Sequence, residues 1–365
     1  MKIGIEITMF KNSLTHQKYR LTQITDRLFT FLEVDELIKK FEDLNWKDLG
    51  NSFEGRPIRM VKIGNGETKV MLWSQMHGDE PTATAAIFDL LNFFQSSESL
   101  ADEILNKLSI YFIPVVNPDG LAVFTRRNAQ KIDINRDFLA LQSPEANLLK
   151  ATFNKIKPDF AFNLHDQSSL YCTPSNNPVG ISFLAPAADK ALTVTWNREQ
   201  AMKVIVEMNH TLQKLIPNQT ARFKDDFEPR AFGDNFQKHC PTILIESGFL
   251  KNDEEKQYIR ALNFEAIIVG LQSIALKSYQ EIDLMNYLMI PIQSQDLFHL
   301  KIKNCIQKEE DKNYKVDLGF VYEENFYAET RTLEKKLILT DIGDLSAQHA
   351  YEIIDASALV FSGNL

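Results

Sequence analysis

Cysteine is scarce in this sequence, and the chain also lacks long apolar runs and a basic excess. The three cysteines, Cys172, Cys240 and Cys305, lie far apart, which excludes a disulfide framework and a paired-cysteine metal site. With 14 Gly and 13 Pro in 365 residues, the chain is too poor in these residues for a linker-rich or disordered protein. No uninterrupted apolar run reaches the roughly 18 residues of a membrane span. We therefore expect a globular protein from a reducing compartment.

The charge balance excludes another class of partner. Lys and Arg number 40 against 49 Asp and Glu, which gives a net charge of -9, so no basic field is available for nucleic acid. Glu6 and Lys11 interrupt the apolar residues at the N-terminus, so no secretory signal peptide is predicted. We expect a cytoplasmic protein that binds neither nucleic acid nor a membrane, while its oligomeric state is unknown.

Short apolar runs alternate with longer amphipathic segments through most of the chain. The predicted strands are 58–63, 69–74, 110–116, 160–164 and 242–245, and the predicted helices lie near 82–96, 144–156, 198–215 and 252–278. This alternation is typical of an α/β domain with a parallel or mixed central sheet.

Two further units flank that domain. A short helix is predicted over 33–44, while after Pro291 a period-two pattern over 298–303, 314–320 and 351–361 predicts a small all-β unit. We expect an N-terminal helical lead-in over 1–45, an α/β domain over 46–282, and a β domain of unknown role over 290–365.

Three residues at predicted strand ends suit a metal ion. His77 and Glu80 follow the strand 69–74, and His165 directly follows the strand 160–164. Polar groups outside the carboxyl ends of strands are where α/β sheets place their functional sites. Two histidines and one carboxylate, with a fourth position for water, are typical of catalytic zinc. Taken singly, each residue also fits an ordinary turn or helix-start position.

An arginine-rich segment follows the Asn117-Pro-Asp-Gly120 turn. Arg126, Arg127 and Arg136 lie close together in a chain that is acidic as a whole. Guanidinium groups bind carboxylates in bidentate geometry and stabilise oxyanions. The alternative is a solvated basic loop, in which Arg136 is a structural ion-pair partner of Asp133 or Asp137.

Glu246 ends the predicted strand 242–245. A carboxylate at a sheet rim beside a metal is a candidate general base toward water. The alternative is an ordinary surface charge at a strand end.

In combination and in chain order, these residues resemble the zinc carboxypeptidase family, in particular its bacterial members with an HGDE zinc segment. The resemblance spans roughly residues 46–280 and rests on His77-x-x-Glu80, Asn117-Pro-Asp-Gly120, Arg126-x-Asn128, Asn135-Arg136, His165 and Glu246. It implies a mixed eight-stranded sheet with helices on both faces. It also implies hydrolysis of an amide bond next to a free carboxylate, most naturally in a short or unusual peptide.

The resemblance also implies a role for each matching residue. His77, Glu80 and His165 would hold one zinc ion per chain, and Glu246 would act as general base and then general acid. Arg126 would stabilise the oxyanion, with Arg127 as the alternative. Asn135 and Arg136 would bind the terminal carboxylate of the substrate.

The sequence departs from the digestive members of the family at two positions. They carry an arginine where Asp79 stands, and a tyrosine shortly before the catalytic glutamate. Here the only tyrosine between His165 and Glu246 is Tyr171, and the expected loop carries Phe223, Phe227, Arg230 and Phe232 instead.

Two other functions remain open at this point. Asp133-Ile-Asn-Arg-Asp-Phe138 and the HGDE segment also resemble deacylases of the aspartoacylase and succinylglutamate desuccinylase type, which would make the substrate an N-acyl amino acid. A binding module that keeps the fold without catalysis is the third hypothesis, although every core position of the site is filled.

Overall fold

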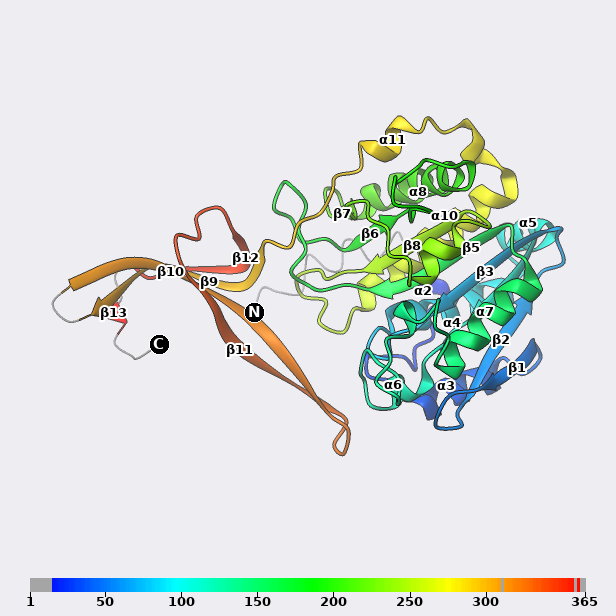
Figure 1. Cartoon of the computed structure of the whole chain (residues 1–365), viewed down its shortest axis with the longest axis horizontal. Coiled ribbons are helices and arrows are strands. Elements are labelled where there is room, and N and C mark those ends of the chain that lie inside the picture. Colours follow the sequence, from blue (N-terminus) through cyan, green and yellow to red (C-terminus); the bar gives the residue numbers. More distant parts are fainter. Residues whose placement is uncertain (1–14, 310–311, 358–359, 362–365) are drawn as a thin grey trace.

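The computed structural model describes residues 15–309, 312–357 and 360–361 and contains two β-sheets (Figure 1). The larger sheet has eight strands in the order β1-β2-β4-β3-β5-β8-β6-β7. The smaller has five strands, in the order β11-β10-β9-β12 with β13 also paired to β9, and projects from the α/β body in Figure 1. The predicted mixed eight-stranded sheet and the small C-terminal β unit are thus confirmed, while the predicted domain limits stay predictions.

The larger sheet consists of β1 (Asn45–Asn51), β2 (Pro57–Ile63), β3 (Thr68–Ser74), β4 (Leu108–Ile113), β5 (Phe160–Asp166), β6 (Ile181–Leu184), β7 (Thr220–Arg222) and β8 (Thr242–Ser247). The smaller sheet consists of β9 (Leu297–Glu309), β10 (Lys312–Tyr327), β11 (Thr332–Gly343), β12 (His349–Asp355) and β13 (Val360–Phe361). The helices are α2 (His16–Tyr19), α3 (Phe31–Lys40), α4 (Thr82–Phe94), α5 (Ser99–Lys107), α6 (Pro118–Ala122), α7 (Pro144–Ile156), α8 (Trp196–Leu215), α9 (Phe232–Phe236), α10 (Gln257–Leu276) and α11 (Met285–Leu288), with 3₁₀ helices η1 (Ile134–Arg136) and η2 (Ser278–Glu281).

Helices cover both faces of the larger sheet, because its central strands are apolar on both sides. Along β3, Val70 and Leu72 belong to the core under α4, α8 and α10. The alternate residues Met71 and Trp73 belong to the core under α7 and α9. Successive side chains of a strand point to opposite faces, so this uninterrupted apolar run is buried from both sides, as parallel strands require.

Helix α10 is long and apolar enough to span a membrane by length and composition alone. In the fold, 83% of its apolar window is buried, where it packs against α4 and α8. It therefore behaves as a core helix of the α/β domain.

The predicted functional residues lie together at the edge of the larger sheet where strands β3, β5 and β8 end. Strands β3, β5 and β8 are neighbours and run parallel, so their carboxyl ends meet at this edge. In the register of β5 and β8, His165 lies directly opposite Glu246.

The Asn117-Pro-Asp-Gly120 segment corrects one prediction. It begins the short helix α6 rather than a simple chain reversal, and the Asn117 side chain accepts a hydrogen bond from the Gly120 backbone N–H at 2.8 Å. Asn before Pro at the first helical position is a common helix start.

Candidate active site

Close backbone packing fixes the turn that carries His77 and Glu80. A Cβ atom added at Gly78 would lie 1.9 Å from the backbone carbonyl carbon of Gly120 in α6, so a side chain does not fit there. The Gly78 N–H also donates to the Thr125 carbonyl at 2.9 Å. Both functional residues are thereby held on one turn between β3 and α4.

The structure brings the three predicted metal ligands together. His77 Nδ1 lies 2.7 Å from Glu80 Oε1, and His165 Nδ1 lies 2.8 Å from Glu80 Oε2. One donor atom from each residue lies within 4.8 Å of the others, and all three residues are buried. This donor set fits a zinc ion with an open coordination position.

A second layer of side chains orients the two histidines. Asp133 Oδ1 lies 3.1 Å from His77 Nε2, and the Asn135 amide nitrogen lies 3.4 Å from His165 Nε2. Metal-binding histidines are usually fixed by a partner on their other ring nitrogen. The sequence had suggested Asp133 only as an ion-pair partner of Arg136, so this contact was missed.

Asn135 is buried, and its amide also contacts the following loop. Its Oδ1 atom accepts a hydrogen bond from the Phe232 backbone N–H at 3.2 Å. The amide therefore has protein partners at both ends, and its predicted contact with the substrate carboxylate stays a prediction.

The buried cluster changes the acidity of its members. Burial opposes a charged imidazole, but the Glu80 charge and the hydrogen bonds with Asp133 and Glu80 outweigh it and raise the pKa of His77 to about 9. Burial also acts against an ionised Glu80, yet the two histidines hold the pKa of its carboxyl well below the usual range. For His165, burial dominates and lowers the pKa.

The geometry separates the two candidate oxyanion residues. Arg126 Nη1 lies 3.3 Å from Glu80 Oε1, and Arg126 Nη2 lies 3.0 Å from Asp133 Oδ2. Arg127 instead donates to the Lys131 carbonyl at 2.9 Å. Arg126 is thus the arginine beside the cluster.

Glu246 lies at the same sheet edge, opposite His165. Among the described residues, no side chain or backbone group is hydrogen-bonded to its carboxyl, so both oxygens are free to accept a proton from water. Burial, followed by the negative charge of Glu80, raises the pKa of Glu246 well above its usual value. A carboxyl of raised pKa is suited to take up and return a proton.

Arg136 carries a carboxylate partner from the loop before α9. Its Nε atom lies 3.6 Å from Glu228 Oε2, and its Nη1 donates to the Asn135 carbonyl at 3.1 Å. Asp137 instead accepts hydrogen bonds from the Ser143 backbone and hydroxyl, both at 2.8 Å. The described contacts thus pair Arg136 with Glu228 rather than with Asp133 or Asp137.

The two departures from the family pattern also lie near the site. Asp79 has a buried Oδ1 atom without a hydrogen-bond partner among the described residues. Tyr171 packs edge-on against Phe223, with ring centroids 5.6 Å apart. Burial and then the charge of Glu246 raise the pKa of Tyr171. Tyr171 comes from the segment between β5 and β6, not from the loop shortly before Glu246.

The chain is similar to known carboxypeptidases in part of its sequence. Residues 33–158 match the family model described as zinc carboxypeptidase. Carboxypeptidase 2 of Trichophyton rubrum is 33% identical over 100 residues, which cover 27% of this chain and 19% of that protein. Carboxypeptidase SOL1 of Arabidopsis thaliana is 25% identical over 162 residues, which cover 37% of this chain and 33% of that protein. The chain thus spans about a fifth to a third of these relatives.

Solved structures share the fold over a longer region. A metallo-carboxypeptidase from Burkholderia cenocepacia has a TM-score of 0.56 at 16% identity, covering 69% of this chain and 70% of that one. One from Pseudomonas aeruginosa, in complex with (2-guanidinoethylmercapto)succinic acid, has a TM-score of 0.55 at 16% identity with the same coverage. At such identities the likeness establishes the carboxypeptidase fold alone.

Proposed function

We propose that this chain is a zinc-dependent carboxypeptidase acting on short or unusual peptides, since residues 33–158 match the zinc carboxypeptidase family model. The observation that carries the proposal is the buried group of His77, Glu80 and His165 beside Glu246 at one sheet edge. The proposal includes one zinc ion per chain. Release of the C-terminal residue from a free-acid peptide by the zinc-loaded protein, followed by mass spectrometry, tests it.

In this proposal, each residue of the site has its own chemical role. When bound, zinc polarises the scissile carbonyl and acidifies water. Glu246 accepts the proton of the attacking water and returns it to the leaving amine. Arg126 donates hydrogen bonds to the developing oxyanion, while Arg136 binds the terminal carboxylate of the peptide.

Replacing Arg136 by Ala is expected to lower kcat/KM at least about tenfold for free-acid peptides, because a charge-assisted hydrogen bond is worth about 1.5–3 kcal/mol. C-terminally amidated peptides should change little, since they lack the carboxylate. Steady-state kinetics on matched free and amidated peptides measure the difference.

Arg59 provides the control for that variant, since it pairs with Asp48 at 3.1 Å on the far strands β1 and β2. Arg59→Ala also removes one arginine charge, and it should leave kcat/KM for free-acid peptides unchanged. Efficient wild-type turnover of amidated peptides would contradict the carboxylate contact. Turnover of N-acyl amino acids alone would assign the protein to the deacylase alternative.

Zinc binding is expected to release about one proton at neutral pH. The His77 pKa of about 9 keeps the imidazole of the metal-free protein protonated, whereas a ligand nitrogen must be neutral. Affinity should therefore rise with pH up to about pH 9. Titration calorimetry in buffers of different ionisation enthalpy counts the proton, and a binding enthalpy independent of the buffer would contradict this assignment.

The same raised pKa predicts a pH-dependent stability of the metal-free protein. Protonated His77 stabilises the fold below its unfolded pKa of about 6.5, and this contribution is lost as the pH rises through about 9. Removing zinc should therefore cost most stability at alkaline pH, which thermal unfolding of both forms can show.

We also propose that the protein works in the cytoplasm. Cys172, Cys240 and Cys305 are all buried and free of disulfides, which supports a reducing compartment.

A further inference from the structure

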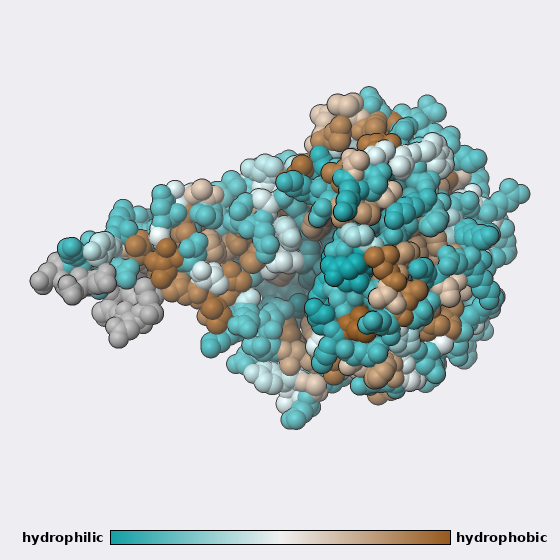
Figure 2. All heavy atoms as spheres, viewed as in Figure 1, coloured by the Kyte–Doolittle hydropathy of each residue, from teal (hydrophilic) through white to brown (hydrophobic). Residues whose placement is uncertain are grey.

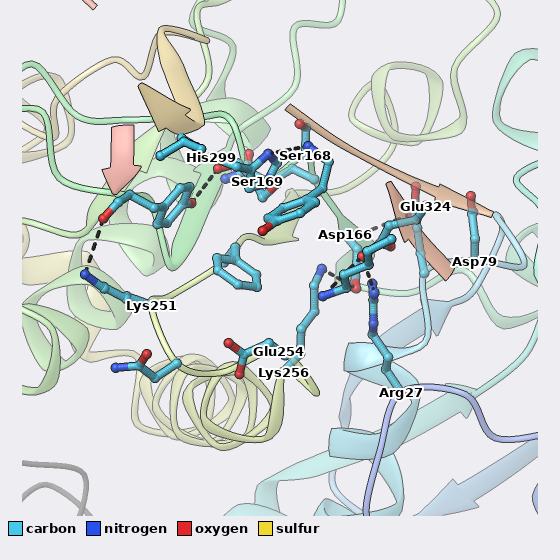
Figure 3. A pocket seen from close by; sticks show the side chains of 18 of the residues that line it. Arg27, Asp79, Asp166, Ser168, Ser169, Lys251, Glu254, Lys256, His299 and Glu324 are labelled. Carbon is cyan, nitrogen blue, oxygen red and sulfur yellow. Dashed lines mark hydrogen bonds and ion pairs between the residues drawn. The ribbon is translucent and has the colours of Figure 1, made fainter. Parts of the chain in front are cut away.

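A cavity of about 590 Å³ lies beside Glu80 and Arg126, and residues of both sheets line it (Figure 3). Asp79, Asp166 and Lys256 come from the α/β domain, while His299, Tyr322 and Glu324 come from the small sheet. The predicted carboxylate-binding residue Arg136 is not part of this lining. The cavity therefore borders the metal group at Glu80 and Arg126 without reaching Arg136.

The hairpin of β10 and β11 spans this cavity and is fastened to the N-terminal segment. Glu324 Oε1 lies 2.5 Å from Arg27 Nη2, and Figure 3 shows both side chains meeting near Asp166. Toward the hairpin tip, Arg331 donates to the Leu28 carbonyl at 2.9 Å. Phe326 packs on Phe124, with ring centroids 5.5 Å apart, just before Arg126 in the chain.

The base of the small sheet is fastened to the loops that follow β5 and β8. His299 Nε2 lies 2.9 Å from Ser169 Oγ, and the Tyr351 hydroxyl donates to the Ser169 carbonyl at 2.5 Å. Lys251 Nζ donates to the Tyr351 carbonyl at 3.3 Å. The small sheet is thus attached on both sides of the cavity, directly beyond the strands that carry His165 and Glu246.

The hairpin presents one face to the cavity and the other away from it. Glu324 and its cross-strand neighbour Lys335 line the cavity, whereas the adjacent pair Glu323 and Lys336 does not. This is the expected alternation of a strand. Figure 2 shows apolar side chains on the surface of the projecting small sheet. Ile353 and Ile354 of β12 are exposed.

We propose that the β10–β11 hairpin closes the cleft on the acyl side and limits the substrate to peptides of a few residues. In this proposal, a peptide held at Arg136 by its carboxyl end places its preceding residues in the cavity beside Arg126 and Glu80. Its volume falls within the roughly 300–1,000 Å³ that encloses a drug-sized ligand, and Tyr322, Glu324 and Lys335 of the hairpin form part of its wall. This inference rests on the proposed carboxypeptidase function and specifies its substrate class.

The test measures kcat/KM for a series of free-acid peptides, from dipeptide to decapeptide, with one common C-terminal residue. The wild-type protein should prefer the shortest peptides at least about tenfold over the decapeptide, which corresponds to about 1.4 kcal/mol. In a first variant, residues 323–336 are replaced by Asn-Gly, a turn that joins two paired strands. In this variant the ratio of kcat/KM for the shortest peptides to kcat/KM for the decapeptide should fall toward one, because kcat/KM for the decapeptide rises.

A second variant changes one side chain and preserves the hairpin. Glu324→Ala removes the ion pair with Arg27 and should raise the relative rate on the decapeptide, whereas Glu323→Ala on the outer face should not. Equal wild-type rates on long and short peptides would overturn the inference, as would a preference that survives in both the shortened hairpin and Glu324→Ala. Hydrolysis of no peptide in the series would instead overturn the proposed function, and this inference with it.

Discussion

The Glu246→Gln variant is expected to keep its fold and its metal but to lose about 10²–10⁴-fold in kcat. The amide has the shape of the carboxyl, yet it cannot accept the proton of the attacking water. Glu246 lies directly opposite His165 in the register of β5 and β8, which places it beside the predicted metal group.

The measurement is steady-state kinetics together with metal content and thermal unfolding of the same preparation. Glu281→Gln, an exposed residue of η2, is the matched control and should behave as wild type. A Glu246→Gln protein that keeps its zinc and turns over at near wild-type kcat would assign the general base to another residue.

The central strands and long helices were predictable because each carries its own pattern. The segment of β3 is apolar throughout, which predicts a strand buried on both faces. The helix predicted over 144–156 occurs with the same limits as α7, where Ser143 caps the first turn. Strands β1, β6 and β7 were missed. Strand β1 is a largely exposed edge strand without an apolar run. Strands β6 and β7 have only four and three residues and are fixed by pairing rather than by their own sequence.

The metal group was predictable for a similar reason. His77 and Glu80 are local in sequence, and His165 and Glu246 each stand at the end of a strand. Once β3, β5 and β8 are parallel neighbours, these ends must converge. The sequence therefore placed the four residues together without any knowledge of their distances.

The contacts around this group needed the tertiary structure. Asp133 lies in an arginine-rich segment, so a partnership with Arg136 was the natural reading, whereas its carboxyl in fact contacts His77. Arg126 and Arg127 are adjacent in sequence, and only the backbone path of their loop decides which side chain reaches Glu80. The cavity wall formed by the small sheet could not be predicted either, because it depends on how two separate sheets pack.

The His165→Ala variant is expected to show the largest loss of metal and, with it, of activity. Removing this side chain leaves His77 and Glu80 as the remaining donors of the group. Losing a partner outside the ligand set typically costs about 10–100-fold in metal affinity, so losing a ligand itself should cost more. We expect zinc well below one per chain and activity near background.

Two comparisons make that prediction specific to the metal group. His239→Ala removes an exposed histidine and should leave the zinc content unchanged, while Asp133→Asn, which weakens the support of His77, should lower zinc affinity by the intermediate 10–100-fold. Metal analysis after dialysis against a weak chelator ranks the three proteins. Because Glu80 bridges both histidines, loss of either should release the ion, so full zinc occupancy in His165→Ala would mean that the metal is held elsewhere.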